Sequence, residues 1–127
     1  IIFYFKFKFR LTTINFNYEF CPTYPRKLIV PKKITDEDLR NCAGFRTKSR
    51  IPTLCWFDKD YKSSIWRSSQ TKSGITQHRN SYDEKLLKQI AETGNGKICI
   101  FDARPYLNAF ANKVLKLLYF LFFLFYF

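Results

Sequence analysis

Four cysteines are the residues of this chain best suited to nucleophilic chemistry. Phosphoryl transfer to cysteine uses a thiolate at the base of a C-x5-R loop, where backbone N–H groups and the Arg hold the phosphoryl oxygens. The cysteines are Cys21, Cys42, Cys55 and Cys99, and six positions beyond them stand Lys27, Lys48, Tyr61 and Pro105. None of these is Arg, so we predict no catalytic residue in the 127 residues and expect buried or half-buried free thiols.

The sequence also lacks the residue patterns of a metal site and of a phosphate-binding loop. The cysteines form no C-x-x-C pair, and the only His is His78, in a polar run beside Arg79. Since a structural zinc site needs four convergent soft ligands, we expect no metal and no cofactor, and His78 is predicted to be an exposed loop residue. Residues 94–97 read G-N-G-K, but no Ser or Thr follows the Lys, and a strand rather than a helix is predicted after it.

The elements that position these residues are predicted in the middle of the chain as a compact α/β segment. Leu28–Val30 is a short apolar strand between two prolines. A helix capped by Thr35 begins with three acidic residues and should end near Gly44. Two β-rich runs, 51–57 and 64–67, flank a polar turn and predict a hairpin.

A second helix and a last strand follow. Residues 69–79 are polar and without period, which predicts a loop, and Ser81 with Glu84 predicts a capping box for a helix that ends at Thr93–Gly96. Lys97–Phe101 has the composition of a buried strand. About four strands are predicted in total, so we expect that this segment does not close a complete core alone.

Both ends of the chain differ from this segment. Residues 1–17 and 114–127 hold ten of the fifteen Phe, and Phe5–Phe9 alternates aromatic and cationic residues in the way of an edge strand. These residue types are those that AT-rich codons specify, so we expect both ends to be non-domain tails, read through from non-coding sequence. The apolar run 117–127 would span only about 16 Å as a helix, which disfavours a transmembrane anchor without removing that alternative.

The chain is strongly basic, with 22 Lys and Arg against ten acidic residues and a formal charge of +12. Residues 20–112 carry 17 basic against nine acidic residues. Such a surface favours anionic membranes or nucleic acid. The cations are scattered, so a solvated surface accounts for most of them; a nucleic-acid binder would rest on charge alone, and we expect no nucleic-acid partner.

The middle segment resembles the myotubularin family of phosphoinositide phosphatases, because it contains several motifs of that family in the same order. They are C-x-T-Y-P at 21–25, A-x-F-R at 43–46, R-x-P-x-L-x-W at 50–56, I-x-R-S-S-Q at 65–70, D-E-x-x-L-x-x-I at 83–90, F-D-A-R-P at 101–105 and N-A-x-A-N-K at 108–113. Thr71 replaces the Pro that the family has after R-S-S-Q. The resemblance runs over residues 18–113 and implies an α/β fold, the incomplete N-terminal part of a cysteine-phosphatase-like domain between non-domain aromatic tails.

This resemblance implies hydrolysis of the 3-phosphate from phosphatidylinositol 3-phosphate and the 3,5-bisphosphate. In the family the nucleophile belongs to a C-S-D-G-W-D-R-T loop that these residues do not contain, so we expect the chain alone to be inactive. By resemblance Asn112 contacts the lipid headgroup, where an amide can donate to phosphate or inositol oxygens, and a helix-capping Asn is the alternative. Residues expected to be scaffold or packing residues are Arg67, Asp102, Arg104, Trp56 and Trp66.

The resemblance also implies partners and a location. We expect a phosphoinositide membrane surface and, in the full-length protein, a second chain of the myotubularin family as partners. The expected location is cytoplasmic and peripheral on endosomal membranes. A non-enzymatic class remains open, because the family includes inactive members that act as adaptors for active ones. The reading frame downstream separates the two: an intact C-x5-R loop indicates the enzyme and a substituted loop the adaptor.

Overall fold

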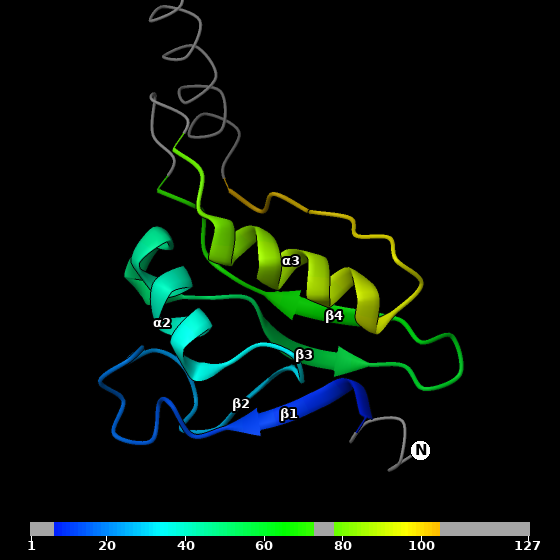
Figure 1. Cartoon of the computed structure of the whole chain (residues 1–127), viewed down its shortest axis with the longest axis horizontal. Helices are drawn as coiled ribbons and strands as arrows, with labels where there is room; N and C mark the ends of the chain where they lie inside the picture. The colour runs from blue at the N-terminus through cyan, green and yellow to red at the C-terminus, as the bar shows by residue number, and fades with distance from the viewer. Residues whose placement is uncertain (1–6, 73–77, 105–127) are drawn as a thin grey trace, which may run out of the picture. The chain divides into compact units, whose positions relative to one another are not determined.

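The structure, a computed structural model, describes residues 7–72 and 78–104 (Figure 1). In chain order the elements are strands β1 (Phe9–Thr12) and β2 (Leu28–Pro31), helix α2 (Asp36–Phe45), the 3-10 turn η1 (Thr47–Ser49), strands β3 (Thr53–Phe57) and β4 (Ser64–Arg67), and helix α3 (Ser81–Thr93). β1 pairs antiparallel with β2 and β3 with β4, so the predicted hairpin and the α/β class are confirmed. All these elements belong to one compact unit.

The first strand lies inside the segment that we expected to be a tail outside the domain. β1 runs opposite β2 over its whole length, with Phe9 opposite Pro31. The Phe9 ring is buried, and its centroid lies 5.2 Å from that of Phe57 and 6.1 Å from that of Trp66. Residues 9–12 are therefore part of the fold, which differs from the expected boundary at residue 18. Strand pairing and burial decide this, whereas composition suggested a foreign segment.

The loop between β1 and β2 is held by a fully buried amide. Asn15 Nδ2 lies 2.9, 3.0 and 2.9 Å from the carbonyl oxygens of Cys21, Tyr24 and Pro25, which share its two N–H groups, and its Oδ1 accepts from the Cys21 N–H at 2.8 Å. One side chain thus contacts four backbone groups, of which the Cys21 carbonyl also accepts from the Tyr24 N–H at 3.0 Å. Asn15 lies in the expected tail as well, and it fixes the start of the C-x-T-Y-P motif.

Helix α2 begins as the sequence predicts. The Thr35 hydroxyl accepts from the Asp38 N–H at 3.1 Å, and the Asp38 carboxylate accepts from the Thr35 N–H at 2.9 Å, which is a reciprocal capping box. Asp38 also receives the Lys85 ammonium group of α3 at 2.9 Å, and Asp36 receives Arg10 of β1 at 2.6 Å. The acidic first turn therefore joins α2 to both of its neighbours.

Helix α3 is capped one residue earlier than predicted. The sequence indicated Ser81 as the cap with Glu84 as its partner, but the structure places Ser81 inside the helix and makes Asn80 the cap. The Asn80 side chain accepts from the Asp83 N–H at 2.9 Å. Glu84 instead receives the exposed Arg79 guanidinium at 2.6 and 2.8 Å, so it is not available for a capping box.

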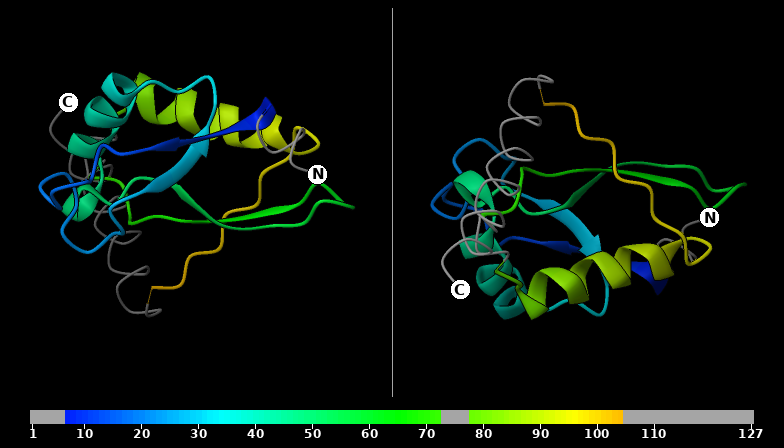
Figure 2. Two further views of the ribbon diagram at one scale, coloured as in Figure 1. Left: turned by 90° about the horizontal axis from the view of Figure 1, so that it is seen from below. Right: turned by 90° about the horizontal axis from the view of Figure 1, so that it is seen from above.

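The core lies between the two helices and β2. The main cluster of buried apolar residues consists of Val30, Ile34, Leu39, Cys42, Ala43, Ile51, Leu86 and Ile90. Both helices lie on the same side of the β3–β4 hairpin (Figure 2). A second, smaller cluster of Cys21, Tyr24 and Leu28 underlies the β1–β2 loop. The helices therefore bury the apolar stripes that predicted them.

The last predicted strand, Lys97–Phe101, does not form. None of its residues has strand structure, no strand of residues 7–72 and 78–104 pairs with it, and Ile100 and Phe101 are 78% and 92% exposed. An extended segment becomes a strand only where a neighbouring edge accepts its backbone hydrogen bonds, so composition alone cannot form one.

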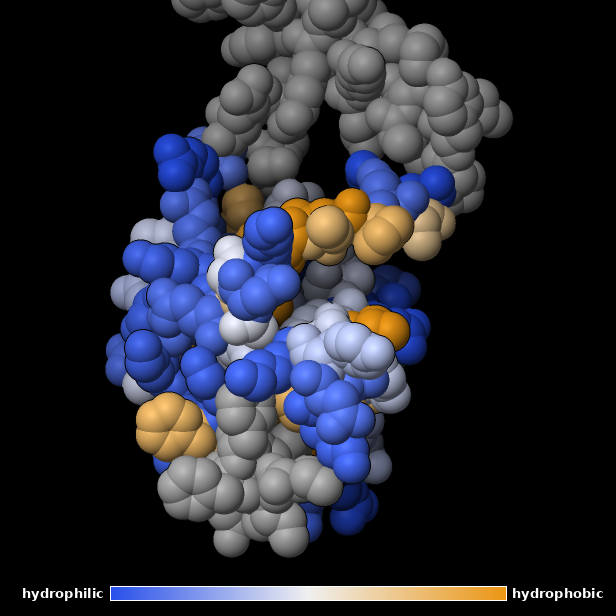
Figure 3. Space-filling view, turned by 90° about the vertical axis from the view of Figure 1, so that its right-hand side faces the viewer, coloured by the Kyte–Doolittle hydropathy of each residue, from blue (hydrophilic) through white to orange (hydrophobic). Residues whose placement is uncertain are grey.

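Hydrophilic residues dominate the face of the molecule that Figure 3 displays, where hydrophobic ones form one connected row and a few isolated patches. Neither α2 nor α3, the helices in the part of the chain that the structure describes, has the length and apolar character needed to cross a bilayer.

Candidate functional site

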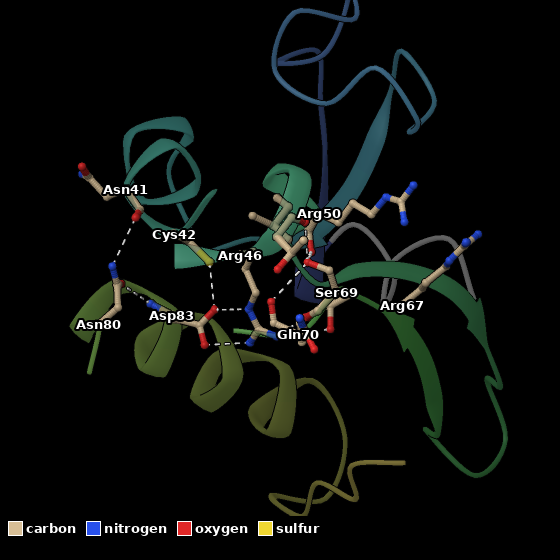
Figure 4. Close-up of polar contacts among 12 residues, drawn as sticks. Asn41, Cys42, Arg46, Arg50, Arg67, Ser69, Gln70, Asn80 and Asp83 are labelled. Carbon is tan, nitrogen blue, oxygen red and sulfur yellow. Dashed lines mark hydrogen bonds and ion pairs between the residues drawn. The ribbon is translucent and has the colours of Figure 1, made fainter. Parts of the chain in front are cut away.

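A buried ion pair joins the end of α2 to the start of α3 (Figure 4). Arg46 Nε lies 2.7 Å from Asp83 Oδ1, and Arg46 Nη2 lies 2.7 Å from Asp83 Oδ2. The two side chains are 8% and 5% exposed. Two parallel N–H···O bonds between planar groups are the strong, orientation-specific form of an ion pair.

The remaining polar atoms of this pair also have partners. Arg46 Nη1 donates to the Ser69 carbonyl at 2.8 Å and to the Ser68 hydroxyl at 3.4 Å. The Cys42 thiol donates to Asp83 Oδ1 at 3.1 Å. Among the described residues, no buried side-chain nitrogen or oxygen lacks a hydrogen-bond partner. The network satisfies the condition under which a buried charge pair is tolerated.

The same network ties the R-S-S-Q motif to the end of α2. The Ser69 hydroxyl donates to the Thr47 carbonyl at 2.7 Å, and the Ser69 N–H donates to the Arg50 carbonyl at 3.0 Å. One step further, the Lys72 N–H donates to the Phe45 carbonyl at 2.7 Å. Motifs that stand more than twenty residues apart in the sequence therefore form one hydrogen-bonded joint.

A buried tyrosine connects the C-x-T-Y-P motif to the R-x-P-x-L-x-W and I-x-R-S-S-Q motifs. The Tyr24 hydroxyl lies 3.1 Å from the Ile51 carbonyl oxygen and 3.2 Å from that of Arg67, which share its one O–H. Burial, and then the nearby Cys21, raise the pKa of Tyr24 to about 12, so the hydroxyl stays a donor at neutral pH. Arg67 acts as a scaffold residue through its backbone carbonyl, which accepts from Tyr24. Its side chain is exposed.

The cysteines are not arranged for nucleophilic chemistry. All four are free thiols, and Cys21 and Cys42 are buried as predicted. Cys55 and Cys99 are exposed, so the prediction that they are buried or half-buried is wrong. Burial, with the Asp83 carboxylate next in effect, raises the pKa of the Cys42 thiol, which keeps it protonated. The described ranges 7–72 and 78–104 contain no group of three or more His, Cys, Asp or Glu side chains that could hold a metal ion.

The other residues singled out in the sequence fall in different places. His78 is exposed, as predicted. Trp66 packs against the core, whereas Trp56 is 50% exposed. Asp102 and Arg104 form an exposed ion pair at 2.5 Å. Asn112, the predicted headgroup contact, lies outside the described residues, so the geometry around it stays a prediction.

Sequence reasoning missed the pairing of Arg46 with Asp83 and the role of Asn15. Arg46 and Asp83 were each part of a recognised motif, but nothing local connects residues 37 positions apart. An Asp at the third position of a helix that already has an Asn cap is a usable signal, because that carboxylate is free to accept from a distant cation. The joint built from these residues positions motif segments; it contains no activated nucleophile and no base beside one.

Known proteins resemble this segment in sequence. Residues 4–117 match the family model described as the myotubularin-like phosphatase domain. Myotubularin of Xenopus laevis is 46% identical over 108 residues, which are 84% of this chain and 18% of that protein. Phosphatidylinositol-3,5-bisphosphate 3-phosphatase MTMR2 of Mus musculus is 45% identical over 106 residues, 82% of this chain and 16% of that protein.

Myotubularin of Rattus norvegicus is 43% identical over 106 residues, again 82% of this chain and 18% of its own length. The chain thus spans less than a fifth of the length of these relatives. The family match begins within the expected N-terminal tail, in agreement with the placement of β1. The motifs between residues 21 and 90 lie in one α/β unit, and this chain belongs to the myotubularin family and represents part of the phosphatase domain.

Proposed function

We propose that these residues form the early part of a phosphatase domain that removes the 3-phosphate from phosphatidylinositol 3-phosphate and phosphatidylinositol 3,5-bisphosphate. The observation that carries the proposal is the match of residues 4–117 to the phosphatase-domain family, together with relatives named as 3-phosphatases of the 3,5-bisphosphate. This part would form a rigid scaffold that positions a catalytic loop and a headgroup site.

The chemistry of this reaction would come from a thiolate in a C-x5-R loop, which is absent from the 127 residues. Attack by that sulfur on the 3-phosphorus would form a phosphocysteine and release the inositol oxygen, and water would then release phosphate. The buried thiol of Cys42 is unsuited to this step because its pKa is raised by burial. We therefore expect the isolated chain to be inactive.

Asn112 is proposed to contact the headgroup of the bound lipid through its side-chain amide. The protein would act in the cytoplasm as a peripheral protein of endosomal membranes. If the reading frame downstream carries a substituted C-x5-R loop, the same scaffold would serve a non-catalytic adaptor that pairs with an active member of the family.

The proposal can be tested with a graft, in which residues 4–117 of this chain replace the matching segment of Xenopus laevis myotubularin. We expect the graft to release phosphate from phosphatidylinositol 3-phosphate in vesicles. Asn112→Ala in the graft should raise KM, whereas Asn95→Ala, an exposed turn residue, should leave it unchanged. A folded graft whose KM is the same with Asn112→Ala would overturn the headgroup role.

A further inference from the structure

The loop between β1 and β2 displays aromatic and cationic side chains that the joint around Arg46 does not use. Phe16 and Tyr18 are 55% and 42% exposed. The guanidinium carbon of Arg26 lies 5.6 Å from the centroid of the Phe16 ring and 5.2 Å from that of Tyr18. Both distances are within the range of a cation–π contact, so one cation holds two exposed rings together.

This arrangement is built into the loop. Tyr18 has a left-handed backbone with φ of 61°, which is unusual for an aromatic residue, and its N–H donates to the Asn15 carbonyl at 2.9 Å. The buried Asn15 amide ties this turn to the carbonyls of Tyr24 and Pro25, next to Arg26. Backbone strain that the surroundings hold in place is a feature of binding sites.

The neighbouring turn adds positive charge. The β1–β2 loop lies beside α2 in both Figure 1 and Figure 2, and Arg50, just after η1, donates from Nε to the Thr23 hydroxyl at 2.9 Å. The Cys21 thiol contacts the Lys48 carbonyl at 3.5 Å. In residues 13–27 and 47–50 together, Glu19 is the only acidic residue, against Arg26, Lys27, Lys48 and Arg50.

We propose that this loop, defined by Phe16, Tyr18, Arg26 and Lys27, is a contact site for bilayers that carry anionic lipids. Aromatic rings favour the bilayer interface, and Lys and Arg beside them bind the lipid phosphates and carboxylates. The site would hold the domain on the surface where a phosphoinositide headgroup is presented. The inference thus deepens the proposed function, but lipid contact itself requires no hydrolysis.

The test measures binding of the whole chain to vesicles in which roughly one lipid in three is phosphatidylserine and the rest is phosphatidylcholine. These vesicles contain no phosphoinositide. Each basic residue near an anionic surface strengthens binding roughly fivefold, so Arg26→Glu with Lys27→Glu should weaken it about 30-fold or more. The matched control is Lys59→Glu with Lys88→Glu, two exposed cations elsewhere, which should have a much smaller effect. Binding should also weaken as salt rises.

The aromatic part has its own pair of variants. Phe16→Ser with Tyr18→Ser should weaken vesicle binding, whereas Tyr61→Ser, which removes an 83% exposed ring in the β3–β4 turn, should not. Circular dichroism of each variant checks that the fold is kept. Equal weakening by both charge-reversed variants would overturn the proposal, and so would equal binding to pure phosphatidylcholine.

Binding of a single-stranded oligonucleotide in preference to the vesicles would also overturn it. Because no phosphoinositide is present in these vesicles, failure of the lipid contact leaves the graft's phosphatase activity as a separate result. An active graft with no vesicle contact at this loop would contradict only the present inference.

Discussion

Two ion pairs in this chain have nearly the same contact distance and very different surroundings. Arg46 and Asp83 meet at 2.7 Å with side chains 8% and 5% exposed, and they connect two helices. Asp102 and Arg104 meet at 2.5 Å with side chains 45% and 36% exposed, and they are two positions apart. Removing one residue of a buried ion pair leaves the other charge without solvent, whereas the remaining residue of an exposed pair is solvated by water. The contact distance alone therefore does not give the contribution of an ion pair to stability.

Removing one partner of the buried pair should have the largest effect. Asp83→Ala leaves the Arg46 guanidinium buried without a counter-charge and should lower the free energy of unfolding by about 3–5 kcal/mol. Urea unfolding followed by tryptophan fluorescence measures the loss. Since this variant could be unfolded from the start, Arg46→Met with Asp83→Leu is the companion: it removes both charges and should recover most of the stability.

The buried amide of Asn15 should come next. Asn15→Ala leaves the carbonyl oxygens of Tyr24 and Pro25 and the Cys21 N–H without the side-chain partner that they have, whereas the Cys21 carbonyl keeps the Tyr24 N–H. We expect a loss of about 1–3 kcal/mol in the same urea experiment. Asn17→Ala is the matched control, because Asn17 is exposed in the same loop. Equal stability of the two variants would mean that residues 13–27 are not held as described.

Acid should weaken the α2–α3 contact through Asp38. Burial raises the pKa of Asp38, but hydrogen bonds from Lys85 and Thr35 outweigh it, so the pKa lies below the ordinary 3.8. A lowered folded-state pKa stabilises the fold above the ordinary value and loses that contribution as pH falls through the folded value. The free energy of unfolding should therefore decline below about pH 4. In Asp38→Asn this decline should be shallower; an unchanged pH profile would exclude Asp38 as its source.

The exposed pair should give the smallest effect on stability. Hydrogen bonds from Arg104 hold the pKa of Asp102 down to about 2. Arg104→Ala should return that pKa toward its ordinary value, as followed by NMR titration of the carboxyl carbon, with no measurable change in urea unfolding. A clear destabilisation would place this pair with the buried one and remove the contrast between them.

Local signals in the sequence predicted the local parts of this fold. Thr35 with Asp38 forms the expected start of α2, and the polar turn between two β-rich runs forms the β3–β4 hairpin. These predictions succeed because the groups that decide them lie within a few residues of one another. The cap of α3 was displaced by one residue because Asn80 competes with Ser81 for the same N–H groups.

What the sequence could not predict depends on distant partners. β1 needs β2 across about twenty residues, and its aromatic composition pointed away from a domain. Lys97–Phe101 has strand composition but no paired neighbour in the described ranges. Within the candidate site, the motifs could be read from the sequence, whereas the joint of Arg46 and Asp83 could not, because tertiary packing alone brings them together.

The most direct test of the account is phosphate release by the graft of residues 4–117 in Xenopus laevis myotubularin. If this chain supplies scaffold and the C-x5-R loop supplies the chemistry, the graft should hydrolyse phosphatidylinositol 3-phosphate within about tenfold of the parent, a difference of about 1.4 kcal/mol in the barrier. Cys42→Ser in the graft should keep this activity, and Cys→Ser in the parent's C-x5-R loop should abolish it. A folded but inactive graft, or activity that survives the loop substitution, would contradict the account.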